Sequence, residues 1–202
     1  MSAPTAPRRL VVAITGASGA LYGTRLLEIC ASLGDVETHL IVSRGARRTI
    51  ASETGRTVAE VAALADVVHA EGDLGAAISS GSFPTCGMIV APCSIKTLSG
   101  IANSYDDNLV VRSADVTLKE GRPLLLMVRE TPLHRGHLRL MTLAAESGAV
   151  IYPPVPAFYT NPSSVADLVD HSCRRALERI GIGTPDTFRW QGMRDASAVT
   201  SA

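Results

Sequence analysis

Three short segments of this 202-residue chain carry side chains that could bind an anion or move a proton. Residues 15–19 read TGASG, residues 94–97 read SIKT, and Arg129 is followed directly by Glu130. Glycines let backbone N–H groups approach a ligand closely, and hydroxyl and ammonium groups suit phosphate. An arginine beside a glutamate can bind an anion and transfer a proton, and on sequence alone it serves equally well as a structural ion pair. The segments therefore indicate a binding site for an anionic ligand.

Each of these segments follows an apolar run that is typical of a buried strand. The runs are RLVVAIT (9–15), GMIVAP (87–92) and PLLLMV (123–128). In an open parallel sheet, ligands bind beyond the carboxyl ends of the strands, so we expect the three segments to meet at one edge. The hydroxyl of Ser94 also suits the cap of a helix, which would explain that residue but not Lys96 and Thr97.

The rest of the chain alternates strands with helices. Further strands are predicted over 36–43 and 149–154, with a short strand and a polar loop within 66–83. Helices are predicted over 20–33, 44–53, 58–65, 94–103, 106–119, 133–147 and from a capping box at Ser164 and Asp167 to Gly181. The pattern predicts a three-layer α/β/α fold, flavodoxin-like or Rossmann-like, with a mostly parallel sheet. We expect one domain over 9–192, with flexible tails at 1–8 and 193–202.

The composition excludes several classes of protein. Lys and Arg number 19 and so do Asp and Glu, and aromatic residues make up 4% of the chain. This balance predicts no general attraction to nucleic acid, and no apolar run approaches the ~20 residues of a membrane span. Four cysteines without a C-x-x-C pair are typical of reduced, mostly buried thiols, so we expect a cytoplasmic globular protein.

The glycine turn alone leaves the choice between a dinucleotide, a flavin and a phosphate open. TGASGA resembles the opening of short-chain dehydrogenases, which also need a Tyr-x-x-x-Lys pair. No tyrosine of this chain is followed four residues later by lysine. An NAD site also needs an acid after the second strand to hold the ribose hydroxyls, where this chain has Ser43 and Arg44. The dehydrogenase interpretation fails on both counts.

Two helical pairs of charged or polar side chains have ordinary structural interpretations. Arg112 and Lys119 lie seven residues apart with Asp115 between them, as on a solvated helix face. His134 and His137 could suggest a metal, but no acidic or cysteine ligands stand at partner spacing, so we expect no metal site and interpret the pair as the first turn of a helix.

The proline-rich segment 153–156 is expected to stiffen a loop that presents Phe158 and Tyr159, which is typical of a subunit contact. Arg174 and Arg175 lie off the apolar stripe of the last helix, and Trp190 most simply anchors the C-terminal tail.

Taken together, the motifs resemble the UbiX family of flavin prenyltransferases, in order from about Arg9 to Gly192. The segments that carry the resemblance are TGASGALYG, ETHLIVSRGAR, SSGSF, APCSIKTLSGI, LKEGRPLLLMVRETPLHRGHLRLM, GAVIYPPVPAFYTNP and FRWQG. Thr15 stands where the family commonly has serine, which keeps the hydroxyl.

The resemblance implies an enzyme that joins a dimethylallyl group from dimethylallyl monophosphate to reduced FMN. The group is attached at flavin N5 and closed onto C6, and the product, prenylated FMN, passes to a UbiD-type decarboxylase. The family also implies a homododecamer with the site between subunits, and no metal. Ubiquinone synthesis is one pathway that such a product serves.

The resemblance also assigns roles to residues. The residues implied to bind flavin are Gly16, Ala17, Ser18, Ser43, Ser94, Ile95, Lys96, Thr97 and Arg129. Those implied to bind dimethylallyl phosphate are Arg112, Lys119, Tyr159, Arg175 and Trp190. Glu130, Ser18 and Lys119 are implied to be catalytic, with Glu130 moving the C6 proton if burial raises its pKa.

Two alternatives remain beside the prenyltransferase. A flavin-dependent decarboxylase that acts on peptidyl cysteine shares the fold, but its family uses an Asn-containing motif and a catalytic His, where this chain has PCSIKTLSGI and VRETP. A non-catalytic FMN-binding subunit of an aromatic acid decarboxylase would tolerate loss of Lys119, Tyr159 and Arg175, all of which are present.

Overall fold

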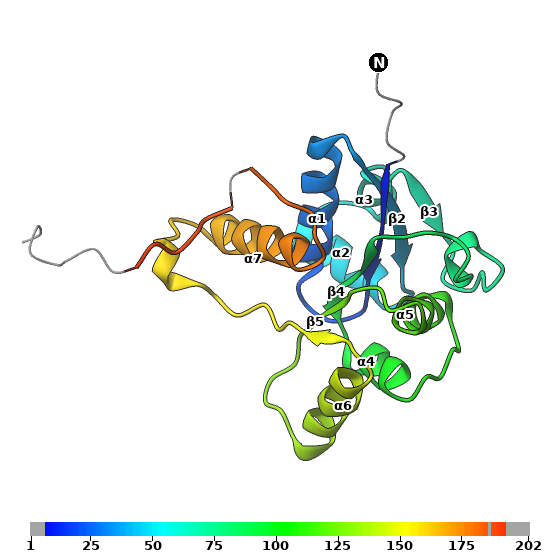
Figure 1. The fold of residues 1–202 in the computed structure, drawn as a ribbon. Coiled ribbons are helices and arrows are strands. Elements are labelled where there is room, and N and C mark those ends of the chain that lie inside the picture. Colours follow the sequence, from blue (N-terminus) through cyan, green and yellow to red (C-terminus); the bar gives the residue numbers. More distant parts are fainter. Residues whose placement is uncertain (1–6, 186, 193–202) are drawn as a thin grey trace, which may run out of the picture.

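The core of the molecule is a six-stranded sheet in which every pair of neighbouring strands is parallel (Figure 1). The structure is a computed structural model, and it describes residues 7–185 and 187–192. The strand order is β3-β2-β1-β4-β5-β6. The strands are β1 (Arg8–Ile14), β2 (Val36–Val42), β3 (Val67–His69), β4 (Gly87–Cys93), β5 (Leu124–Val128) and β6 (Val150–Ile151).

Helices cover both faces of the sheet, which makes three layers. One face packs against α1 (Ala20–Leu33), α2 (Ala46–Thr54), α3 (Val58–Ala62) and α7 (Val165–Arg179). The other packs against η1 (Ala77–Ser79), α4 (Ile95–Ala102), α5 (Leu109–Lys119) and α6 (Arg135–Glu146). A short 3-10 turn, η2 (Phe158–Thr160), precedes α7. The predicted three-layer α/β/α fold is confirmed.

The continuous apolar runs of the central strands follow from burial on both faces. In β1, Leu10, Val12 and Ile14 pack toward α1 and α7, while Val11 and Ala13 pack toward α4 and α5. Because successive side chains of a strand point to opposite faces, a strand covered on both sides must be apolar throughout.

Most predicted elements appear within one or two residues of their expected ends, and the differences have local causes. Helix α5 begins at Leu109 instead of residue 106, because the side chain of Asn108 caps it by accepting the N–H of Val111. Helix α6 begins at Arg135, after Nδ1 of His134 accepts the N–H of Gly136. Strand β6 has two residues, not six, since the chain turns into the proline-rich loop.

The expected tails fall largely outside the described residues. This is true of 193–202 and of most of 1–8, although β1 already begins at Arg8. All four cysteines are free, and Cys30, Cys93 and Cys173 are buried, as predicted. None of the helices in the described ranges is long and apolar enough to cross a membrane.

Starting from β1, the chain adds β2 and β3 on one side of the sheet and then β4, β5 and β6 on the other. Folds with this strand order bind ligands in the crevice between β1 and β4, where the direction of strand addition changes. The buried hydroxyl of Thr15 joins the two strand ends, since its Oγ1 donates to the carbonyl of Pro92 (2.7 Å) and accepts the N–H of Ser94 (2.8 Å). Helix α1 lies very close to the same strands. A Cβ on Gly23 would come within 2.4 Å of the carbonyl oxygen of Ala91, so only glycine fits there.

A stacked histidine pair at the β2–β3 edge makes the stability of the fold depend on pH. Nδ1 of the buried His39 lies 2.9 Å from Nε2 of His69, and Nε2 of His39 lies 2.9 Å from the carboxylate of Glu37. Burial, and then the charge of His39, lower the pKa of His69 below 6.5, although Asp73 opposes the shift. A lowered pKa means that the folded state favours the neutral ring, so its contribution is complete above pH 6.5 and is lost as pH falls through the folded pKa.

Acidification below pH 6.5 is expected to lower the free energy of unfolding of the unsubstituted protein. In His69→Gln the same acidification should lower it by a smaller amount. The difference should stay under ~1.4 kcal/mol, the value of a full pKa unit, because the ring is only partly buried. Urea unfolding at a series of pH values measures it, with His134→Gln as the control. Equal slopes for the unsubstituted protein and His69→Gln would contradict the assignment.

Candidate functional site

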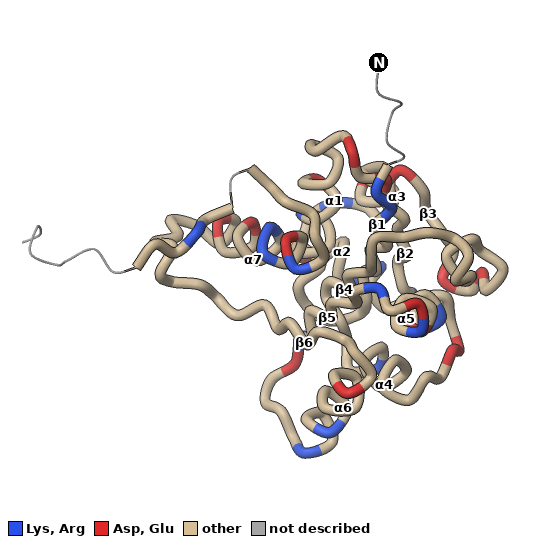
Figure 2. Tube along the Cα trace, viewed as in Figure 1, with Lys and Arg blue, Asp and Glu red and all other residues tan. Residues whose placement is uncertain are grey.

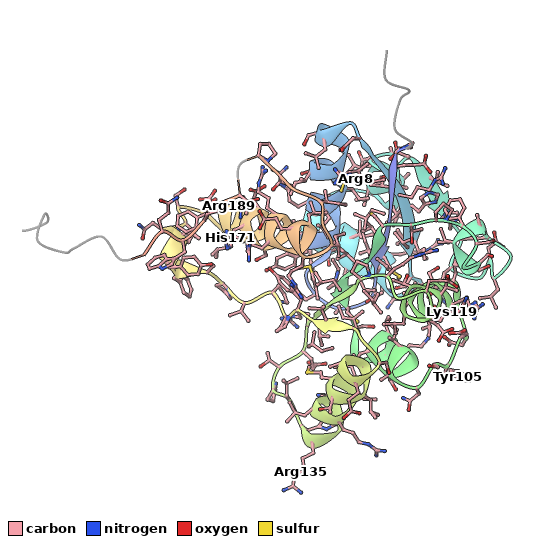
Figure 3. The ribbon with its side chains drawn as sticks, viewed as in Figure 1. Arg8, Tyr105, Lys119, Arg135, His171 and Arg189 are labelled. Atoms are coloured by element: carbon pink, nitrogen blue, oxygen red, sulfur yellow. The ribbon has the colours of Figure 1, made fainter. Side chains whose placement is uncertain are left out.

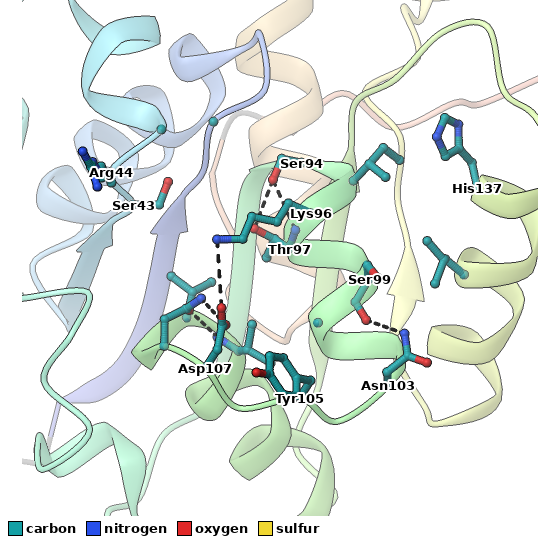
Figure 4. Close-up of a pocket in the computed structure, with 18 of the residues that line it drawn as sticks. Ser43, Arg44, Ser94, Lys96, Thr97, Ser99, Asn103, Tyr105, Asp107 and His137 are labelled. Carbon is teal, nitrogen blue, oxygen red and sulfur yellow. Dashed lines mark hydrogen bonds and ion pairs between the residues drawn. The ribbon is translucent and has the colours of Figure 1, made fainter.

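The carboxyl ends of the central strands open into a cavity of about 1350 Å³. Its lining includes six of the residues expected to bind flavin, namely Gly16, Ser43, Ser94, Ile95, Lys96 and Thr97. Figure 4 labels four of them, Ser43, Ser94, Lys96 and Thr97. The six residues come from three loops that are remote in sequence and that the parallel sheet brings to one edge. Ala17 and Ser18 belong to the same loop as Gly16 but do not line the cavity.

The β4–α4 turn directs the start of a helix at the cavity. Ser94 caps α4, since its Oγ accepts the N–H of Thr97 (3.3 Å) and lies 3.1 Å from the hydroxyl of Thr97. A helix N-terminus concentrates unpaired N–H groups and positive potential, which favours a bound anion. Ser94 is therefore both a helix cap and part of the cavity lining.

The rim of the cavity is rich in cations. The side chain of Lys96 is 81% exposed, and its ammonium group lies 4.0 Å from Asp107, at the edge of ion-pair distance. Arg44 and Arg48 also line the cavity, and within the described ranges no carboxylate lies within ion-pair distance of either guanidinium. The backbone N–H of Arg44 donates to Glu71 (2.7 Å), which fixes the β2–α2 loop. The rim thus suits a phosphate group.

Two glycines let the β1–α1 and β2–α2 loops touch beside the cavity. A Cβ on Gly16 would lie 3.0 Å from Cα of Gly45, and a Cβ on Gly45 would lie 3.1 Å from Cα of Gly16. Both contacts are to backbone, which cannot move without shifting a loop that lines the cavity.

We expect Gly16→Ala to weaken flavin binding by about tenfold, since small overpacking of this kind costs about 1–3 kcal/mol. Quenching of FMN fluorescence on titration measures the effect. Gly72→Ala is the matched control, because a Cβ there meets nothing within 4 Å. If Gly16→Ala binds FMN as tightly as Gly72→Ala, the contact between the loops does not shape the site.

Glu53, on α2, is a residue of this region that the sequence analysis missed. Its Oε2 accepts the backbone N–H groups of Gly19 (2.7 Å) and Ala20 (2.8 Å), so it caps α1, whose own N-cap residue is a glycine. Burial raises its pKa, but hydrogen bonds from Ser18, Gly19 and Ala20 and the charge of Arg129 outweigh burial and hold the pKa below its ordinary value. Glu53 is therefore a carboxylate that orients Ser18.

Arg129 and Glu130 lie beyond the end of β5 and outside the cavity lining. The backbone N–H of Arg129 donates to the carbonyl of Cys93 (3.1 Å), which extends the pairing with β4. Oε1 of Glu130 accepts the N–H of Thr131 (3.0 Å), and the residue is exposed. The burial that its expected proton transfer requires is not provided within one chain.

The residues expected to bind the prenyl phosphate form two separate groups, and neither lines the cavity. Arg112 and Lys119 lie on α5, where Arg112 pairs with Asp106 (3.0 Å) and Asp115 (3.3 Å) and Lys119 pairs with Glu120 (2.6 Å). Figure 3 shows Lys119 on one side of the molecule, with His171 and Arg189 on the other.

The second group is built by η2, α7 and the C-terminal segment. Tyr159 and Trp190 have ring centroids 5.8 Å apart in an edge-on arrangement, and both side chains are more than half exposed. Arg175 lies on α7. Burial raises the pKa of Tyr152 overall, although the charge of Arg175 lowers it. Tyr159 lies near enough to Tyr152 to raise the same pKa further. One chain therefore gathers Tyr159, Arg175 and Trp190 but keeps Lys119 apart from them.

Within the described ranges, no group of three or more His, Cys, Asp or Glu residues could hold a metal. His134 and His137 line the cavity with ring centroids 3.6 Å apart, and they form the cap and first turn of α6. The sequence predicts no ligand-binding role for either histidine.

Comparison with known proteins places this geometry among flavin enzymes. A family model described as Flavoprotein matches residues 2–176. The chain is 58% identical over 187 residues to flavin prenyltransferase UbiX of Escherichia coli K12, covering 92% of this chain and 99% of the relative.

Two solved structures are also similar. AnUbiX (PadA1), solved in complex with FMN and dimethylallyl pyrophosphate, matches with a TM-score of 0.90 and 49% identity over 93% of this chain and 100% of its own. A dodecameric FMN-dependent UbiX-like decarboxylase of E. coli O157:H7 matches with a TM-score of 0.88 and 49% identity over 91% of this chain and 100% of its own.

Proposed function

This chain belongs to the UbiX family of flavin prenyltransferases, and from that membership we propose that it transfers the dimethylallyl group of dimethylallyl monophosphate to reduced FMN. The observation that carries the proposal is the cavity at the carboxyl ends of the strands, together with a similar structure solved with FMN and dimethylallyl pyrophosphate.

The residues present fit FMN. The capped N-terminus of α4 and the cations of the rim suit its phosphate. The close contact of Gly16 with Gly45 leaves backbone, not side chains, facing the ligand. In our proposal the flavin-binding residues are those expected above, including Ala17, Ser18 and Arg129, which lie outside the cavity lining of one chain. Reduced flavin supplies the nucleophilic N5 atom, and the protein supplies orientation.

We further propose that the site is completed between subunits of a homo-oligomer, a dodecamer like its similar structure. Lys119 and Arg112 would come from one chain, and Tyr159, Arg175 and Trp190 from another. The support is their separation within one chain, since no rearrangement of side chains brings α5 to α7 across the sheet. Assembly would also bury Glu130 and the exposed Phe158 and Tyr159.

The proposed roles follow from how charge moves in the reaction. The C–O bond of the donor would break as phosphate leaves with its electron pair, and N5 of reduced FMN would bond to the freed carbon and lose its proton. Ring closure would add a proton to the remaining double bond of the prenyl chain, form the bond to C6 and release the proton that C6 carried. Lys119, Arg175 and the hydroxyl of Tyr159 would stabilise the departing phosphate, with Arg112 assisting. The face of Trp190 would stabilise the allylic cation, and Glu130 would accept the proton from C6.

The product, prenylated FMN, would serve a UbiD-type decarboxylase in the cytoplasm, with ubiquinone synthesis as one pathway. The proposal includes no nucleic acid, membrane or metal partner.

The experiment is anaerobic incubation of the purified protein with reduced FMN and dimethylallyl monophosphate, followed by mass spectrometry of the flavin. A gain of one dimethylallyl unit supports the proposal. Unmodified FMN that stays bound would overturn it in favour of a non-catalytic flavin subunit. Release of CO2 from a peptidyl-cysteine or phenolic acid substrate, without change in the flavin, would favour a decarboxylase.

A further inference from the structure

Glu178 on α7 holds two arginines at once. Its Oε2 accepts a hydrogen bond from Nη1 of Arg175, and its Oε1 accepts one from Nη2 of Arg189 at 2.8 Å. The side chain of Glu178 is 11% exposed, whereas those of Arg175 and Arg189 are 42% and 70% exposed. Each oxygen of a nearly buried carboxylate therefore serves a different, solvent-facing guanidinium.

Aromatic rings also connect the segments that carry the two arginines. Arg189 lies between Phe188 and Trp190, whose ring centroids are each 5.8 Å from that of Tyr159. The hydroxyl of Tyr159 lies 3.5 Å from Nε2 of His171, one turn before Arg175 on α7. Glu178 thus supplies the charged connection between α7 and the segment that carries Trp190. Figure 2 shows that α7 carries both acidic and basic residues.

We propose that Glu178 is a positioning residue for the prenyl phosphate, acting through Arg175. This inference rests on the proposed function. A guanidinium has five N–H donors in a rigid plane, so the bond from Nη1 to Glu178 fixes the plane and leaves donors free for a phosphate. A guanidinium fixed in this way loses less freedom when it binds.

Neutralising Glu178 would change the affinity for phosphate in opposite directions through its charge and through its hold on Arg175, so the proposal can be tested. One carboxylate beside two guanidiniums leaves the cluster with one net positive charge. Neutralising Glu178 adds a positive charge, so electrostatics alone would tighten the binding of a phosphate. Loss of the partner that fixes Arg175 would instead weaken it.

The test is Glu178→Gln, which keeps the size of the side chain and removes its charge. We expect the Kd and KM for dimethylallyl monophosphate to rise about tenfold, the size of one lost hydrogen bond to a charged group, with kcat and the Kd for FMN unchanged. The Kd is measured by titrating the monophosphate into FMN-loaded protein, so it does not depend on turnover. Glu178→Asp, which keeps the charge, should recover part of the loss.

Asp170→Asn is the matched control, because Asp170 is also a carboxylate of α7 that pairs with two arginines, Arg25 (2.6 Å) and Arg174 (2.6 Å). We expect it to leave the Kd for the monophosphate unchanged, with thermal melting used to verify that both variants fold.

An unchanged or lower Kd in Glu178→Gln would overturn the inference, as would an equal rise in Asp170→Asn. An unsubstituted protein that binds the monophosphate but never modifies FMN would overturn the proposed function alone.

Discussion

Lys119→Ala and Arg175→Ala are each expected to lose prenyl transfer by about 100-fold or more, because each removes a cation that stabilises the leaving phosphate. A mixture of the two variants is expected to regain activity. If Lys119 and Arg175 of one site come from different chains, some sites in a mixed oligomer receive both intact residues. Random mixing in equal amounts should restore about one quarter of the sites.

The measurement is the initial rate of flavin prenylation after the two variants are unfolded, mixed and refolded together. Lys119→Ala mixed with Arg112→Ala is the control. Both residues lie on α5 of the same chain, so every site keeps one defect and no activity should return. Equal recovery in both mixtures, or recovery in neither, would contradict a site shared between α5 and α7 of different subunits.

Glu130→Gln is expected to slow formation of the four-ring product by about 100-fold, the typical contribution of a general base. The amide keeps the shape of the side chain and its hydrogen bond to Thr131 but cannot accept the C6 proton. We expect the dimethylallyl mass to be added to the flavin as before, while the absorption spectrum of the closed ring fails to develop.

Glu146→Gln provides the comparison for Glu130→Gln, since Glu146 is also exposed and lies at the far end of α6. It should behave like the unsubstituted protein. Release of the four-ring product by Glu130→Gln at the normal rate would remove Glu130 from the chemistry.

The fold could be predicted because its signals are local. Helix α1 appears over the range predicted from its apolar stripe, and α7 begins at the capping box of Ser164 and Asp167. The exceptions include the starts of α5 and α6, where the side chains of Asn108 and His134 decide the first turn, and the early ends of α3 and β6. Such caps depend on one rotamer, which periodicity does not encode.

The candidate site was predictable only in part. Gly16, Ser43 and residues 94–97 lie together because each follows a parallel strand, and the carboxyl ends of parallel strands lie at one edge of the sheet. Glu53 could not be found in this way, since it caps α1 from 34 residues away along the chain. Nor could the separation of Lys119 from Arg175 be predicted from spacing, because it depends on which face of the sheet each helix covers.

The carboxylate of Glu53 is also expected to disfavour dinucleotides at this site. Dinucleotide enzymes with this strand order place a pyrophosphate on the N–H groups that begin the first helix. Here Glu53 already accepts the N–H groups of Gly19 and Ala20, and its lowered pKa keeps it negative at neutral pH. The protein carries its own permanent anion where NAD would place its diphosphate, so discrimination between cofactors is built into a helix cap.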